Sequence, residues 1–547
     1  MDMAMAMDIT TQAANKRRLH NKLAWHVALV MAVSVNADAA TSEIKVSAGA
    51  DITFTERKYD DGTTLEALTY ELSPTVAYTV DGNKLDLAFV VSHTQLGSDD
   101  QSVIDNQHYT DFSASLIAEP LHWWKVTLSA NRNYRTTNPF DNALGGRYFN
   151  TDSLSEITTY QAGTEFILNN RSVVGTLGAR YGETNSDLIK GTQSFFTNFD
   201  NKSVAAYLQL AAPGAQGVFW AVSANQAYIQ REAYSDYESV SAAAQFSAPL
   251  YQQLFMRVQG SHEKYDVDGI NANFGGLQYR DQTSYGAGLE WRRSAKKFIA
   301  VTYNSADRAG LEDRESYVGV DLAWAFSERT SVAADYGKRF YGTAKSLTIR
   351  HENRSLTSSI GHKEDISTFS RLGVEQDIAV YVCPIDAAGV FDCNRAEGDY
   401  VPLPGEFLIN TIDNIAEVNE EVRFNKRTFA NFAWDVTAKS NLGLGLNHSE
   451  TLYLETNRLR ETDSANLFWR YRLNKSSNIN ASLTWRDDQG EGGILEGESI
   501  SLAVGHTRQL GRHLDFAVNY RFLDRTADNA FYSLRENKLS VAITYQF

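Results

Sequence analysis

The chain ends with residues 536–547, ENKLSVAITYQF, in which large apolar side chains occupy every second position from Leu539 onward. Small or polar residues stand between them. Successive side chains of a β-strand point to opposite faces, so this period of two predicts a strand with one apolar and one polar face. About ten alternating residues suffice to cross a bilayer at a tilt. The end of the chain therefore predicts a membrane-spanning strand.

This strand closes on two aromatic residues, Tyr545 and Phe547. The ending resembles the C-terminal signal that the outer-membrane barrel assembly machinery reads, and we expect that machinery to be a partner. The same alternation, with Arg and Asn beside aromatic residues, recurs upstream in residues 84–91, 466–473, 479–486 and 514–522. Such segments are typical of strands with one wet face and one apolar face.

The segments between the expected strands alternate between short and long. Short ones include residues 81–83, 119–122, 169–170, 213–216, 352–354 and 511–512, and longer polar ones lie between them at residues 97–107, 135–152, 183–201, 266–280 and 524–535. Transmembrane barrels have short periplasmic turns and longer outer loops, whereas a soluble sandwich has no reason to keep this alternation. We predict an all-β fold, a transmembrane antiparallel up-and-down β-barrel of about 24 strands (roughly 22–26). An even count places both ends of the barrel in the periplasm.

Residues 1–39 are expected to be a cleaved signal peptide. Residues 16–22 are rich in Lys and Arg, residues 23–35 form an apolar run too short for a spanning helix, and residues 37–39 read Ala-Asp-Ala, a cleavage site. The mature chain, residues 40–547, is then expected to be an integral protein of the outer membrane of a Gram-negative bacterium, in contact with its lipid and lipopolysaccharide. The net charge of −16 argues against a nucleic-acid partner.

One long segment, residues 367–423, interrupts the regular pattern. It contains both cysteines of the chain, Cys383 and Cys393, which we expect to form a disulfide in an oxidising, exported context. By parity this loop lies outside. A barrel of this size cannot fill its lumen with wall side chains, so we expect the loop to fold into or over the lumen as a plug.

Arginines on the expected polar faces have two interpretations. Arg470, Arg472, Arg486 and Arg521 either belong to a solvated lumen wall or form a cationic track for an anionic solute or polysaccharide. We favour the solvated wall. The tryptophans beside charged residues have two interpretations as well, and we favour membrane-interface residues over sugar-stacking platforms: Trp123, Trp124, Trp469 and Trp485.

No catalytic, cofactor or metal site is predicted, and we do not expect an enzyme. The 11 histidines show no metal-ligand spacing. Asp266 and Asp268 resemble the start of a calcium loop, but Leu277 stands where that loop needs Glu. His448 to Glu450 is a local catalytic candidate, although neighbouring residues of a strand face opposite sides.

Three stretches look like hairpins of a known family: residues 73–95 (SPTVAYTVDGNKLDLAFVVSHTQ), 118–134 (AEPLHWWKVTLSANRNY) and 345–368 (KSLTIRHENRSLTSSIGHKEDIST). They resemble the outer-membrane barrel family associated with PEP-CTERM protein-sorting and exopolysaccharide gene clusters. The resemblance covers most of the mature chain. It implies a conduit or scaffold in exopolysaccharide or surface-polymer export, with polysaccharide or its export proteins as partners.

Two other functions remain open beside the one that the resemblance implies. A general or solute-selective porin would follow from the wide barrel alone. A barrel enzyme would need a catalytic group at the rim, and none is evident. A TonB-dependent receptor is disfavoured, because alternation begins at Ile44, almost directly after the expected cleavage site, and leaves no room for an N-terminal plug.

Overall fold

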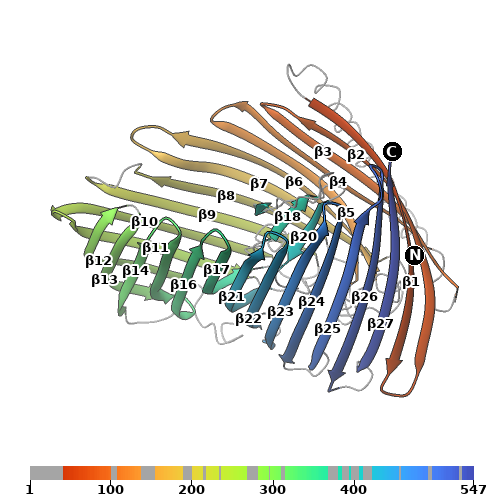
Figure 1. Cartoon of the computed structure of the whole chain (residues 1–547). Helices are drawn as coiled ribbons and strands as arrows, with labels where there is room; N and C mark the ends of the chain where they lie inside the picture. The colour runs from red at the N-terminus through yellow and green to blue at the C-terminus, as the bar shows by residue number, and fades with distance from the viewer. Residues whose placement is uncertain are drawn as a thin grey trace, which may run out of the picture.

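A computed structural model describes residues 41–99, 107–136, 154–188, 200–212, 217–232, 236–267, 281–294, 296–308, 314–367, 380–384, 394–395, 406–410, 422–454, 457–490, 496–528 and 533–547. Within these residues the chain forms one 24-stranded antiparallel sheet and one separate three-stranded sheet. The large sheet is closed, because its first and last strands pair with each other from Ser47 and Gln546 to Tyr59 and Leu534. The predicted barrel and its strand number are confirmed (Figure 1).

The strands of the barrel follow the chain order around its wall. They are β1 (Thr41–Tyr59), β2 (Thr64–Asp81), β3 (Leu85–Ser98), β4 (Gln107–Leu121), β5 (Trp124–Thr136), β6 (Leu154–Asn169), β7 (Val174–Leu188), β8 (Asp200–Ala211), β9 (Phe219–Arg231), β10 (Tyr237–Tyr251), β11 (Leu254–Val267), β12 (Asp281–Ser294), β13 (Lys297–Arg308), β14 (Glu315–Ala325), β15 (Thr330–Arg339), β16 (Gly342–Glu352), β17 (Leu356–Ser367), β21 (Arg423–Thr437), β22 (Ser440–Tyr453), β23 (Leu459–Asn474), β24 (Ser477–Gly490), β25 (Gly497–Gln509), β26 (Leu514–Ala527) and β27 (Leu534–Gln546).

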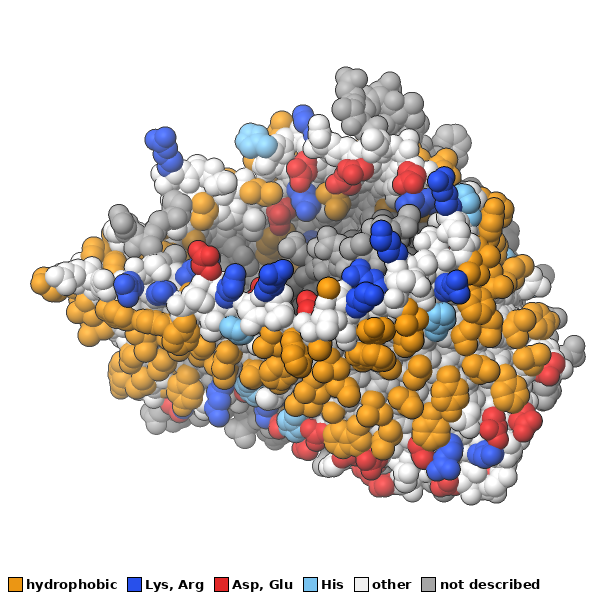
Figure 2. Space-filling model, in the orientation of Figure 1, with side chains coloured by type: hydrophobic (Ala, Val, Ile, Leu, Met, Phe, Trp, Pro, Cys, Tyr) orange, Lys and Arg blue, Asp and Glu red, His pale blue; other side chains and the backbone are white. Residues whose placement is uncertain are grey.

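The outer face of the wall is apolar, as the alternation predicts. On β27, Val541 and Ile543 are 38% and 45% exposed, whereas Glu536 on the opposite face is 1% exposed. Figure 2 shows a broad band of hydrophobic side chains around the outer wall. A closed barrel pairs every backbone group of its strands and can therefore face lipid without an open edge. The protein is an integral outer-membrane barrel.

No helix among the described residues is long and apolar enough to cross a membrane.

The connections fall into two sets at opposite ends of the barrel. Those at the end that carries Thr41 and Phe547 are mostly two to four residues long, as in the periplasmic turns of outer-membrane barrels. The opposite set contains the long segments, and also the four-residue turn between β1 and β2.

In the turn between β1 and β2, Asp61 accepts a hydrogen bond from the backbone N–H of Thr63 (2.7 Å), and hydrogen bonding to Thr63 lowers the pKa of the Asp61 carboxyl.

Strands β10 to β15 curl tightly, and small inward-facing residues make the curl possible. A Cβ atom on Gly288 would lie 2.0 Å from the backbone oxygen of Val301. One on Gly286 would lie 2.0 Å from Oδ1 of Asn304. Neighbouring strands are about 4.8 Å apart, so two side chains on strands that are three positions apart in the sheet can touch only where the sheet bends strongly. Glycine at these two positions lets the backbones approach.

An apolar cluster joins separate parts of the wall at the outer end of this curl. The rings of Phe340 and Tyr341, in the connection between β15 and β16, pack on Tyr265 of β11 (centroids 4.8 Å) and on Phe424 of β21 (4.5 Å), respectively. Ile229 of β9 belongs to the same cluster and is 3% exposed. The cluster therefore holds β9 to β11 against the β15–β16 connection and β21.

The long loop lies between Ser367, the last residue of β17, and Arg423, the first residue of β21. It contains the separate sheet of β18 (Val380–Pro384), β19 (Asn394–Arg395) and β20 (Glu406–Asn410), and β17 pairs directly with β21 across it. Cys393 lies outside the described residues, and Cys383 lies in β18, so their disulfide stays a prediction. The plug role of the loop stays a prediction too, and the signal peptide, residues 1–39, lies outside the described residues.

Candidate functional site: the inner wall of the barrel

The inner face of the wall carries charged and amide side chains that are paired across strands. The pair at the seam of the barrel is typical. Arg57 of β1 donates to Oε2 of Glu536 on β27 through Nη2 (2.7 Å) and Nε (3.1 Å), and both side chains are almost fully buried. Buried charges of this kind are tolerated only when they are paired and hydrogen-bonded.

Arg257 of β11 lies at the centre of the curled segment and is 5% exposed. Its Nη2 donates to Oε1 of Gln245 on β10 (2.7 Å) and lies 2.5 Å from Oδ2 of Asp321 on β14. Its Nε donates to Oε1 of Gln259 (3.0 Å). One guanidinium thus ties together strands that are up to three positions apart in the sheet.

A second cross-wall pair lies beside it. Nε of Arg339, on β15, lies 3.0 Å from both carboxylate oxygens of Glu263 on β11. Asp335 of β15 is the direct cross-strand partner of Asp321, and Arg257 and Arg339 are both close enough to attract it. Like charges placed opposite each other repel, and the attraction of the two arginines offsets only part of this repulsion.

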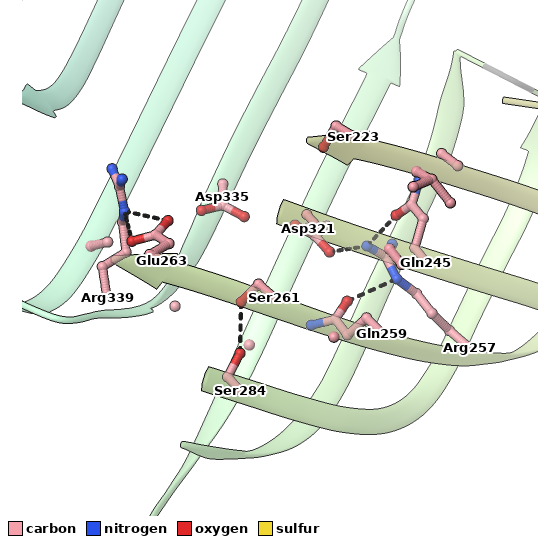
Figure 3. A pocket seen from close by; sticks show the side chains of 18 of the residues that line it. Ser223, Gln245, Arg257, Gln259, Ser261, Glu263, Ser284, Asp321, Asp335 and Arg339 are labelled. Atoms are coloured by element: carbon pink, nitrogen blue, oxygen red, sulfur yellow. Dashed lines mark hydrogen bonds and ion pairs between the residues drawn. The ribbon is translucent and has the colours of Figure 1, made fainter. Parts of the chain in front are cut away.

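These residues line a cavity of about 680 Å³ in the curl. In Figure 3, Arg257, Gln259 and Glu263 project from one side toward Asp321 and Asp335 on the other. Pockets of roughly 300–1,000 Å³ hold small molecules, with a few placed polar groups that fix their orientation. The cavity falls within this range of volumes, and charged and amide side chains face each other across it.

A cationic cluster occupies the inner wall further along the barrel. The carboxylate of Asp488 on β24 accepts hydrogen bonds from Nε of Arg486 (2.6 Å) and from Nη2 of Arg460 on β23 (3.1 Å). It also accepts one from the hydroxyl of Thr462 (2.8 Å). Arg525 of β26 is 7% exposed and interacts electrostatically with the other three charges. Three guanidinium groups therefore surround one carboxylate.

The four predicted lumen arginines lie on the polar faces of their strands. Arg470 and Arg472 alternate with the outward Trp469, which is 37% exposed. Arg470 lies over the ring of Phe468 (5.7 Å), and Arg472 donates to the backbone oxygen of Ala438 (2.7 Å). Of these four arginines, only Arg486 belongs to the cationic cluster. Arg521 is the cross-strand partner of Lys538 on β27. Whether any of them guides a solute stays a prediction.

Of the two residues of the expected assembly signal, Tyr545 lies in β27 and Phe547 directly follows this strand. Tyr545 and Phe547 are 43% and 75% exposed and contact each other edge to face. The backbone N–H of Phe547 donates to Val46 of β1 (2.9 Å). The aromatic ending therefore completes the seam of the barrel, and its reading by the assembly machinery stays a prediction.

The rejected catalytic segment forms an ion-pair group on the outer face. His448 Nδ1 lies 2.8 Å from Asp463, and Glu450 lies 2.9 Å from Lys426. The described residues contain no group of three or more His, Cys, Asp or Glu side chains that could hold a metal ion.

The curled segment and its charged pairs were not predicted from the sequence. Arg257 and Asp321 are 64 positions apart, and Glu263 and Arg339 are 76 apart, so no local spacing relates them. One feature of the sequence does indicate the bend: Gly286 and Gly288 both lie on the inward face of β12. Glycine inside a strand marks a bend or a close approach of two backbones.

No family model and no curated protein matches this chain. Among solved structures it is similar to the siderophore receptor PirA from Acinetobacter baumannii, with 8% identity, a TM-score of 0.44, and 91% of this chain and 80% of that chain covered. PirA from Pseudomonas aeruginosa has 9% identity and a TM-score of 0.38, with 92% and 80% covered. The copper transporter OprC has 9% identity and a TM-score of 0.42, with 93% and 80% covered.

These similarities correct one expectation. The structures that the chain resembles are described as siderophore receptors and a copper transporter, and none of these descriptions concerns a polysaccharide. The expected role as a conduit or scaffold in exopolysaccharide export is therefore wrong. The resemblance to the PEP-CTERM-associated barrel family is not tested by these similarities and stays a prediction.

Proposed function

We propose that this barrel takes up a small polar solute across the outer membrane and binds it in the cavity of the curled segment. The observation that carries the proposal is the cavity itself, about 680 Å³ in volume, with paired charges from β11 facing those from β14 and β15. A solute with both donors and acceptors can exchange hydrogen bonds with such a lining. The barrel then supplies the passage and the cavity supplies selectivity.

The test is solute entry into liposomes that contain the purified full-length protein. Swelling rates with neutral sugars of increasing size should fall steeply once the sugar exceeds the cavity. Asp321→Asn weakens the pair with Arg257, and we expect it to change the uptake rate of the smallest sugars at least threefold. The matched control is Asp307→Asn, which removes an exposed carboxylate that pairs with Arg314, and it should leave the rates unchanged.

Two results would contradict the proposal. The first is the absence of swelling with every sugar, although the protein is folded. The second is identical selectivity in the wild type and in Asp321→Asn.

A further inference from the structure

The connections at the end of the barrel that carries Thr41 and Phe547 are strongly basic. Of the eleven, eight carry one Lys or Arg each. These residues, here called the periplasmic cations, are Lys84, Arg171, Lys296, Arg329, Arg354, Lys439, Lys475 and Arg512. Glu328 is the one acidic residue in these connections. The whole chain has 67 acidic against 51 basic residues, so this excess does not reflect composition.

The periplasmic cations are exposed and make no ion pair within 4.0 Å with another described residue. Cations at the opposite end of the barrel behave differently. There Arg535 pairs with Asp524 (2.8 Å), and Lys426 pairs with Glu450 (2.9 Å). The charges of the periplasmic set are therefore available to a partner outside the chain.

Aromatic residues fix the depth of these charges relative to the membrane. Trp291, Trp324 and Trp434 each precede a periplasmic cation by five residues, and Trp469 precedes Lys475 by six. Tryptophan is enriched at the boundary between the hydrocarbon and the headgroups. At about 3.3 Å per residue along a tilted strand, the cations lie just beyond that boundary, at the depth of the headgroups. Figure 2 shows Lys and Arg side chains along the upper edge of the near wall, above the hydrophobic band.

We infer that the periplasmic cations bind the phosphate groups of anionic phospholipids in the inner leaflet of the outer membrane. Lys and Arg near a membrane surface are attracted to anionic lipid, and both donate to phosphate oxygens. This interaction anchors the barrel at a fixed depth and draws anionic lipid around it.

The distribution of the charges favours lipid over an acidic protein. The six connections from β12–β13 to β25–β26 each carry a cation, and Lys84 and Arg171 extend the set to the other side of the wall. A protein partner needs one compact patch, whereas a lipid leaflet surrounds the whole barrel. Charges that are spread around the circumference therefore fit the leaflet.

Brominated lipids that quench tryptophan fluorescence give the test. The full-length protein is placed in vesicles of phosphatidylethanolamine with either brominated phosphatidylglycerol or brominated phosphatidylcholine. The test variant carries Arg354→Gln, Lys439→Gln, Lys475→Gln and Arg512→Gln. The matched control removes two Lys and two Arg at the other end of the barrel, as Lys58→Gln, Arg314→Gln, Lys426→Gln and Arg535→Gln.

We expect the wild type to prefer the anionic lipid about threefold, and 0.5 M salt to remove the preference, because salt screens exposed charges. The test variant should lose at least half of this preference, and the control should keep it. Heat-modifiable mobility on gels shows that each variant is folded. Equal quenching by both lipids in the wild type would overturn the inference, and binding of an acidic polypeptide without lipid preference would assign the surface to a protein. An equal loss in both variants would also overturn it.

Discussion

Asp488 holds together arginines that would otherwise repel one another on the inner wall. Its carboxylate lies 2.6 Å from Nε of Arg486 and 3.1 Å from Nη2 of Arg460, and both arginine side chains are 13% exposed. Since Arg525 adds a third positive charge, removing this one carboxylate leaves three cations together. We therefore expect this residue to influence both the stability of the wall and the ion selectivity of the lumen.

Asp488→Asn tests this role. The amide keeps the size of the side chain but loses its charge, so we expect the folded barrel to be destabilised by about 2 kcal/mol, the range found for hydrogen bonds to charged groups. Reversal potentials in a salt gradient should shift toward anions. The control is Asp524→Asn, which loses an exposed pair with Arg535 on the outer face and should shift neither quantity appreciably. An unchanged reversal potential for Asp488→Asn would show that this cluster does not face the ion path.

At the scale of the strand, the close approach of β12 to β13 depends on glycine. The Cβ that alanine would add at position 288 meets a backbone oxygen at 2.0 Å, which no side-chain rotation relieves. We expect Gly288→Ala to destabilise the barrel by roughly 2–3 kcal/mol, as overpacking does elsewhere. Unfolding in urea, followed by gel mobility, measures the change.

Gly260→Ala is the matched control on the adjacent strand. Its added Cβ would lie 3.5 Å from the nearest atom, the backbone oxygen of Ser284, which is an ordinary contact. We expect a change below about 0.5 kcal/mol. Equal effects at positions 260 and 288 would show that the curl is not set by backbone approach.

The same scale shows how far the sequence determines the fold. The period of two and the alternating connections predicted the strands, their number and both faces of the wall, because each depends on neighbours within one or two strands. The curl was not predicted, since it depends on contacts such as that between Arg257 and Asp321, three strands apart. The lumen arginines were placed on the polar faces by alternation, but the partner of Arg486, two residues away on the same face, was not recognised.

At the scale of the whole molecule, the barrel exists only if its first and last strands meet. Residues of β1 and β27 pair from Ser47–Gln546 to Tyr59–Leu534, and the Arg57–Glu536 ion pair lies within this seam on the inner face. The two residues are 479 positions apart, so the pair forms only when the chain is complete and the sheet has closed. The presence of this ion pair therefore indicates that the barrel has closed.

Glu536→Gln leaves the Arg57 guanidinium buried without its counter-charge, and we expect a loss of about 3 kcal/mol in the free energy of unfolding. The double variant Arg57→Met with Glu536→Leu replaces the pair by apolar side chains of similar size, and it should recover most of that loss, because no charge remains buried. Unfolding in urea from liposomes measures both variants, and Arg535→Gln, one position away on the outer face, serves as the control. If the double variant is as unstable as the single one, the seam needs the hydrogen-bond geometry of Arg57 and Glu536 rather than the neutralisation of a buried charge.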